Sequence, residues 1–122
     1  MGLSKNMMGG GFSAGQAKAI NGAVATGLTA AGTVIGDALD LTADLNIIGT
    51  AAASTGVQLP SCEVGDSCQI YNGGANAVKV YPDSSSNTIN QLSAGSAMLL
   101  ATNTACQYFK ISSTRWVANL SA

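Results

Sequence analysis

The sequence predicts an all-β domain: a sandwich or small barrel of seven to eight short antiparallel strands, behind a glycine- and alanine-rich amino-terminal arm. Three observations predict this fold. Apolar and polar residues alternate within short segments. Turn residues separate these segments at intervals of about ten residues, and no amphipathic helix long enough for a βαβ crossover lies between them. With 122 residues, the chain has room for one core and is too short for two.

The strongest strand signal lies between residues 67 and 82. Cys68 and Ile70 alternate with polar residues in its first half, and Val78 and Val80 do so in its second half. An Asn-Gly-Gly sequence separates the halves, and these residues tolerate the positive φ angles of a tight turn between twisted strands. The pattern predicts a β-hairpin.

Other segments alternate in the same way and end at turn residues such as Gly-Asp, Pro-Asp and Ala-Gly. Their spacing is typical of a sandwich or small barrel and argues against a parallel α/β fold. The further predicted strands lie at residues 39–41, 45–49, 57–59, 97–101, 106–111 and 116–120.

The amino-terminal part has a different composition. We expect residues 1–36 to form an extended or partly disordered arm and residues 37–122 to form the β domain. Glycine recurs too often in the arm for a stable helix, since each one costs about 1 kcal/mol relative to alanine, although residues 16–24 fit a short helical turn. Four apolar side chains of the arm are candidates for contact with a partner surface or a neighbouring subunit: Leu3, Met7, Met8 and Phe12.

Charge is scarce throughout the chain. Charged residues make up 9% and apolar residues 47% of the sequence, and the formal net charge is −1. A monomer of this composition must cover its surface with small polar residues or with other subunits. The five basic residues are scattered, which argues against a nucleic-acid partner. Residues 19–36 are uncharged but too weakly apolar to insert into a membrane, and no secretory signal is evident, so we expect a soluble protein made in the cytoplasm.

Catalytic motifs are present only in part. The segment GFSAG at residues 11–15 matches the G-x-S-x-G nucleophile elbow, but the chain has no histidine to accept the proton of Ser13. We therefore expect no enzymatic activity and no cofactor.

Acidic residues cluster at two places. Asp37, Asp40 and Asp44 resemble an oxygen-rich cation loop, but their spacing fits no EF-hand, so we expect no metal site. Glu63 and Asp66 flank one tight turn, and a role in that turn is the better interpretation.

Three cysteines, Cys62, Cys68 and Cys106, are an odd number and fit no zinc spacing. In a protein made in the cytoplasm they are expected to be reduced and mostly buried thiols. A bridge between Cys62 and Cys68 is the alternative.

The aromatic residues have two interpretations. Trp116 is expected to share the inward face of its strand with Ala118 and Leu120 and to anchor the core, with a ligand-stacking platform as the alternative. Tyr71, Lys79 and Tyr81 are expected to lie together on the outward face of the predicted hairpin. Such a patch would be a candidate interface between subunits.

Several stretches together carry a family resemblance. NGGANAVKVYP, TINQLSAG and TRWVANLSA, together with the lead-in that begins at Leu28, resemble small head decoration (cement) proteins of tailed bacteriophages over residues 28–122. Related sequences also occur in phage fibre modules. The resemblance implies a jelly-roll-like domain, a homotrimer, and attachment to the outside of an icosahedral head, where it clamps neighbouring major capsid subunits. The three cysteines depart from the pattern, which has small apolar residues there.

The resulting hypothesis is a non-enzymatic virion protein that is made in the host cytoplasm and located on the capsid exterior. Its partners would be the major capsid protein and further copies of itself, with neither nucleic acid nor membrane. The alternative is a receptor- or glycan-binding module of a phage head or tail fibre, with Tyr71, Tyr81 or Trp116 as contact residues. A hydrolase is nearly excluded by the missing histidine.

Overall fold

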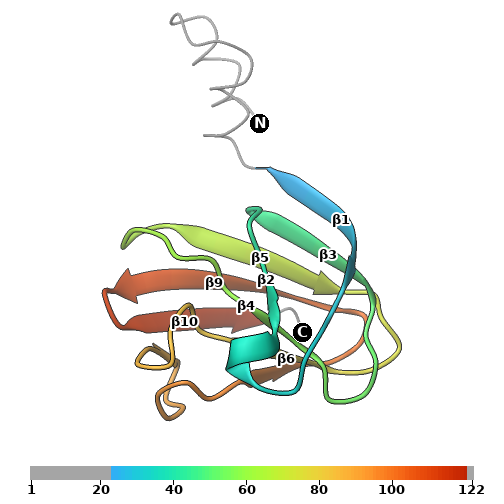
Figure 1. Ribbon diagram of the computed structural model, residues 1–122. Coiled ribbons are helices and arrows are strands. Elements are labelled where there is room, and N and C mark those ends of the chain that lie inside the picture. Colours follow the sequence, from blue (N-terminus) through green and yellow to red (C-terminus); the bar gives the residue numbers. More distant parts are fainter. Residues whose placement is uncertain (1–22, 121–122) are drawn as a thin grey trace, which may run out of the picture.

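The computed structural model describes residues 23–120, and within this range the chain forms ten strands, one short 3₁₀ turn, and no α-helix (Figure 1). The all-β prediction is confirmed. Six strands form sheet A, in the order β1 (Val24–Thr29), β3 (Leu45–Thr50), β5 (Ser67–Asn72), β9 (Thr104–Ser112), β10 (Arg115–Leu120) and β7 (Thr88–Ile89). Four strands form sheet B, in the order β2 (Leu39–Asp40), β4 (Gly56–Gln58), β6 (Val78–Tyr81) and β8 (Met98–Leu100).

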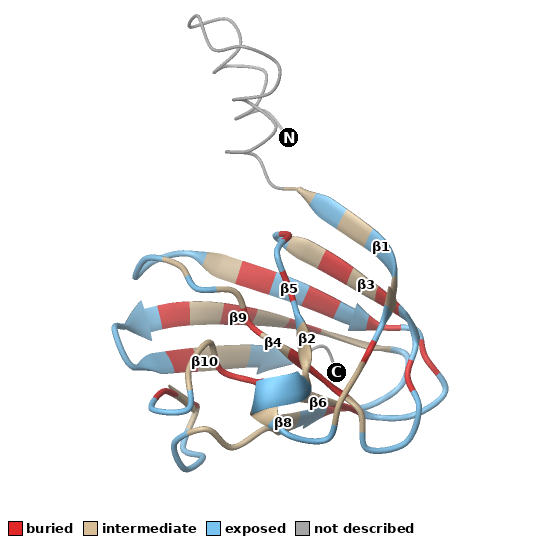
Figure 2. Cartoon of the chain, in the orientation of Figure 1, coloured by how far each residue is buried: buried red, intermediate tan, exposed pale blue. Residues whose placement is uncertain are grey.

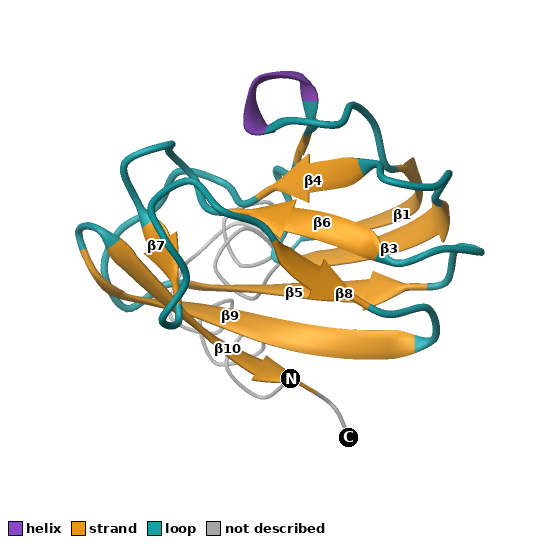
Figure 3. Cartoon of the chain, turned by 90° about the horizontal axis from the view of Figure 1, so that it is seen from below, coloured by secondary structure: helices purple, strands orange, loops and turns teal. Residues whose placement is uncertain are grey.

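The two sheets are arranged as a β-solenoid of about four turns, so the predicted jelly-roll sandwich or barrel of antiparallel strands is wrong. From β1 to β6 the chain alternates between the sheets, and each of the strands β1 to β4 pairs in parallel with the strand that comes two strands later. Figure 3 shows the two sheets facing each other, with β4, β6 and β8 opposite β5 and β9. A strand in the opposite sheet thus provides the return path that a helix provides in a βαβ unit, and parallel pairing needs no helix here.

The last turn runs in the opposite direction. Strand β8 pairs antiparallel with β6, and β9 pairs antiparallel with β5. The chain then turns back through a hairpin into β10, whose other edge pairs in parallel with β7.

The segment from β5 to β6 is not a hairpin, because its two strands belong to different sheets. Neither Gly73 nor Gly74 has a positive φ. These glycines are needed for close approach: a Cβ on Gly74 would lie 2.7 Å from the backbone nitrogen of Ala51, in the preceding turn of the solenoid. Asn72 fixes this connection, since its Nδ2 donates to the carbonyls of Asn76 and Leu100, each at 2.9 Å.

The core lies between the sheets, where inward side chains alternate with outward ones, as Figure 2 shows along β5 and β9. The largest fully buried side chains are Trp116 and Tyr108, both 0% exposed. The prediction that Trp116 is a core anchor is confirmed. All three cysteines are free thiols, with Cys68 and Cys106 buried and Cys62 partly buried.

The predicted arm and the described structure overlap. Residues 24–29 form β1, which pairs with β3, and residues 31–38 form a loop that contains the 3₁₀ turn Ile35–Asp37. The arm residues Leu3, Met7, Met8, Phe12 and Ser13 lie outside the described residues.

Candidate functional sites: a buried ion pair and an uncharged sheet face

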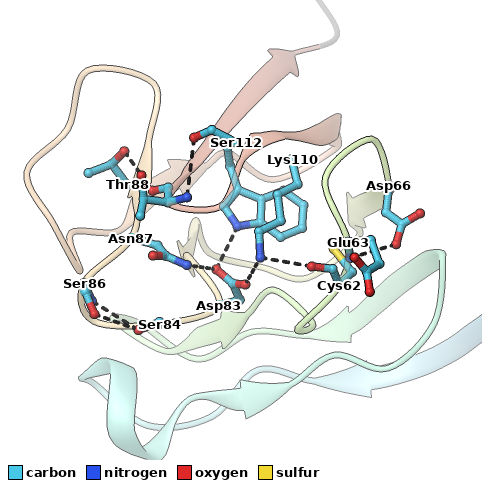
Figure 4. Close-up of polar contacts among 12 residues, drawn as sticks. Cys62, Glu63, Asp66, Asp83, Ser84, Ser86, Asn87, Thr88, Lys110 and Ser112 are labelled. Carbon is cyan, nitrogen blue, oxygen red and sulfur yellow. Dashed lines mark hydrogen bonds and ion pairs between the residues drawn. The ribbon is translucent and has the colours of Figure 1, made fainter.

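A buried ion pair joins the loop after β6 to the inner side of sheet A (Figure 4). The Nζ of Lys110 lies 2.7 Å from Oδ2 of Asp83, and the two side chains are only 8% and 5% exposed. Lys110 points inward because it lies two residues after the buried Tyr108 and therefore on the same face of β9. Its Nζ also donates to the carbonyl of Cys62 at 3.0 Å.

The carboxylate of Asp83 has three hydrogen-bond donors within residues 23–120. Besides Lys110, the indole Nε1 of Trp116 donates to Oδ1 at 3.0 Å, and Nδ2 of Asn87 donates to the same oxygen at 2.6 Å. Burial by itself raises the pKa of this carboxyl, but the hydrogen bonds from Lys110, Trp116 and Asn87 outweigh it and lower the pKa below its ordinary value. The carboxylate is held as a charged structural link between the loop and the sheet.

This ion pair was not predicted from the sequence. Asp83 follows Pro82 and reads as a turn residue, and Lys110 lies 27 positions away in a predicted strand. A charged residue at an inward position of β9, between Tyr108 and the strand end, is the one clue that alternation offers.

The predicted contact residues Tyr71, Lys79 and Tyr81 do not share one face, because the hairpin that would have aligned them is absent. Tyr71 lies on sheet A with 37% of its surface exposed, whereas the other two lie on β6 in sheet B. Tyr81 is only 7% exposed. Lys79 is partly buried.

The loop of residues 31–38 accounts for this burial. The carbonyl of Thr33 accepts hydrogen bonds from the hydroxyl of Tyr81 at 3.0 Å and from Nζ of Lys79 at 3.3 Å. Burial, and then the nearby charge of Asp37, raise the pKa of Tyr81. Gly56 makes room for the tyrosine ring, since a Cβ there would lie 2.9 Å from Cε2 of Tyr81. This loop therefore binds the outward side of sheet B.

The side of sheet A that points away from sheet B, called its outer face below, has a different character. Five side chains form one row across five paired strands, in the order Val24, Leu45, Gln69, Gln107 and Asn119. A second row contains Ile47, Tyr71 and Ala105, and a third contains Ser67, Phe109 and Val117. None of these side chains is charged.

The described surface includes two depressions that bear on the candidate sites. One, of about 260 Å³, is lined by the outer-face residues Leu45, Gln69, Ala105, Gln107 and Asn119 together with Ile70, Cys106 and Leu120. The other, of about 440 Å³, lies where β2 and β4 end, beside Asp40, Pro60 and Asp83.

Asp37, Asp44 and Asp66, from the two acidic clusters, accept hydrogen bonds from backbone amides. Asp37 accepts from the amide of Val34 at 3.1 Å, Asp44 from that of Ala23 at 3.2 Å, and Asp66 from that of Glu63 at 3.0 Å. The turn role predicted for the last pair is confirmed. Among residues 23–120, no three His, Cys, Asp or Glu side chains lie close enough together to hold a metal ion.

No family model, curated protein or solved structure matches this chain. Over the described range, no helix has the length and hydropathy needed to cross a membrane. Function must therefore be argued from the residues and their arrangement.

Proposed function

We propose that this chain is a structural protein of a phage virion, a homotrimeric decoration protein that binds the outside of the assembled capsid and stabilises it. The observation that carries the proposal is a surface rich in large apolar side chains and poor in charge. The sequence resemblance over residues 28–122 supplies the phage context.

Eight large apolar side chains are exposed among the described residues: Val24, Val34, Val64, Tyr71, Leu92, Leu99, Ile111 and Leu120. Six of these eight are more than half exposed, and these six lie on both sheets and in the loops between strands. With charged residues at only 9% of the sequence, few charges separate them. Such a surface favours contact with other protein surfaces over a wide area.

The mechanism is binding that depends on the assembled state. A protein that binds only the assembled lattice shifts the equilibrium between intact and disrupted capsids toward the intact form by its free energy of binding. No bond is made or broken, and the residues that matter are contact residues. Tyr71 and Lys79 remain candidates among the described residues, and Leu3, Met7, Met8 and Phe12 among the others.

The test is a pull-down on capsids that lack the decoration protein. Full-length protein should sediment with the particles, and a variant that lacks residues 2–15 should bind more weakly while keeping nearly the same thermal midpoint. A matched control replaces the polar arm residues Ser4 and Ser13 with alanine, which should leave binding unchanged. Equal binding by the truncated and full-length proteins would remove the arm from the mechanism, and no binding by either would refute the proposal.

A receptor- or glycan-binding fibre module is the second candidate, and one observation favours it. The depression of about 260 Å³ on the outer face of sheet A is lined by three amide side chains, Gln69, Gln107 and Asn119. Tyr71 pairs in register with Ala105, which lines the same depression. Amides beside an aromatic ring suit a sugar, and binding of the purified protein to host cells or to surface oligosaccharides without capsids would favour this candidate.

A further inference from the structure

The outer face of sheet A has polar groups without partners. No side-chain hydrogen bond of Gln69, Gln107 or Asn119 occurs within residues 23–120, although these residues stand side by side in one row. Each amide offers two donors and one acceptor oxygen. In a cyclic oligomer whose axis faces this row, the amides of one copy can therefore donate to the amides of the next, which like charges could not do.

Apolar side chains flank this row on both sides. Ile47 and Tyr71 lie in one neighbouring row, and Phe109 and Val117 lie in the other. An apolar surface with a few uncharged polar groups and no ionic residue is the composition of the centre of a subunit interface. On sheet B, by contrast, the loop of residues 31–38 binds the outward side.

The size of the face suits this role. β1, β3, β5 and β10 have six residues each. Five strands spaced ~4.8 Å apart, taken over this common length with a rise of ~3.4 Å per residue, give a flat area of roughly 500 Å². The accessible surface of a side-chain-covered face exceeds its flat area, and a standard interface buries about 800 Å² on each partner. The face can supply most of such an interface.

The charges at one end of the face favour a ring. Asp44 precedes β3 and Asp66 precedes β5, whereas Arg115 begins β10 near the opposite edge of the same sheet. Arg115 is exposed and has no ion pair within residues 23–120. Around such an axis the β10 side of one copy meets the β3 and β5 side of the next, so Arg115 lies near the aspartates of its neighbour, and head-to-tail contacts of this kind can close into a ring.

We propose that the outer face of sheet A is the surface through which copies of this chain associate, with the amide row Gln69, Gln107 and Asn119 at its centre. This inference deepens the proposed function and rests on it, since it locates the contact of the homotrimer. It replaces the Tyr71, Lys79 and Tyr81 patch expected from the sequence as the interface.

The experiment compares three full-length proteins by sedimentation equilibrium at micromolar concentration. The unaltered chain should be a trimer. Gln69→Lys places like charges together in the interface and should weaken association at least about tenfold. The matched control Gln91→Lys makes the same chemical change in the exposed turn after β7 and should remain trimeric.

Gln107→Glu provides a second variant with the opposite charge and the same expected loss of association. The near-UV circular dichroism of the buried Trp116 shows whether each variant is folded. A monomeric unaltered chain overturns the inference, and so does a trimer that both charged variants preserve. An unaltered monomer that becomes an oligomer when residues 2–15 are removed also overturns it, because the chain itself then covers the face.

Capsid binding separates this inference from the proposed function. A trimer that Gln69→Lys dissociates but that does not bind capsids supports the interface and refutes the decoration role. A monomer that binds capsids refutes the interface and supports the decoration role. A stable oligomer whose binding to an oligosaccharide is abolished by Gln69→Lys assigns the row to sugar and overturns the interface.

Discussion

Replacing Asp83 with asparagine tests the buried ion pair most directly. The substitution keeps the size of the side chain and an acceptor oxygen for the indole of Trp116, but it removes the charge that compensates Lys110. The Lys110 side chain is only 8% exposed, so water cannot take the place of the carboxylate. Removing one partner of a buried pair costs about 3–5 kcal/mol.

That cost is large for a domain of this size. A domain of about 100 residues is stable by roughly 5–15 kcal/mol, and 1 kcal/mol shifts its melting midpoint by about 4–8 °C. We therefore expect Asp83→Asn to lower the midpoint by about 12 °C or more. Urea unfolding, followed by the fluorescence of Trp116, measures the change in the free energy of unfolding.

Two further variants complete this test. Asp40→Asn alters an exposed aspartate and should change the free energy of unfolding by no more than about 0.5 kcal/mol. Combining Asp83→Asn with Lys110→Met removes both charges and should restore most of the loss, because the penalty comes from the uncompensated ammonium group. A single variant as stable as the Asp40 control, or a double variant no more stable than the single one, would refute the reasoning.

The remaining predictions concern pH, packing and thiol reactivity. The folded-state pKa of Asp83 is lowered, so the stability that its charge contributes is complete above the unfolded pKa of about 3.9 and is lost as the pH falls through the folded value. In acid titrations, the difference in the free energy of unfolding between the unaltered chain and Asp83→Asn should therefore be constant near pH 7 and shrink below about pH 4. Trp116→Ala should cost about 3–5 kcal/mol in urea unfolding, since the side chain is 0% exposed; an unchanged midpoint together with lost binding to cells or glycans would favour the fibre module. Gly56→Ala should cost about 1–3 kcal/mol, because its Cβ would lie 2.8 Å from the carbonyl oxygen of Lys79, whereas Gly36→Ala, with no atom within 4 Å, should be neutral by the same measurement. Burial raises the pKa of Cys68 to about 12, so iodoacetamide at pH 8 should modify this thiol, as mapped by mass spectrometry, only after unfolding, and rapid labelling of the native protein would contradict its burial.

Most strand positions could be read from the sequence, although β1 was assigned to the arm and β7 was not predicted. The partners of the strands could not be read from it. Cys68 and Ile70 alternate with polar residues, as do Val78 and Val80, and both predicted segments are strands. Alternation records only which side chains are buried, and it has the same period in a hairpin and in two strands that face each other across a core. The turn was the misleading signal, since Gly74 is required by its approach to Ala51 and has no positive φ.

For the candidate sites, too, the sequence predicted the direction of single side chains but not which residues lie together. Trp116 was correctly placed in the core, because one strand suffices to predict its direction. The ion pair of Asp83 and Lys110 joins residues 27 positions apart, and the row of Gln69 and Gln107 depends on the register between β5 and β9. Such contacts depend on how the strands pair in the folded solenoid, which alternation within one strand does not reveal.

The two ends of the solenoid differ in strand direction, and this difference decides at which end additional coils could be inserted. Partners in successive parallel strands are separated by similar numbers of residues: Val24 and Leu45 by 21, Leu45 and Gln69 by 24. One coil therefore corresponds to a sequence unit of nearly constant length, and duplicating such a unit before β5 would add a rung without altering the pairings of its neighbours. The opposite end is closed to such growth, because β8 and β9 run antiparallel to the strands they cover. Gene duplication could lengthen this protein toward its amino-terminal end while the carboxy-terminal rungs stay fixed as a cap.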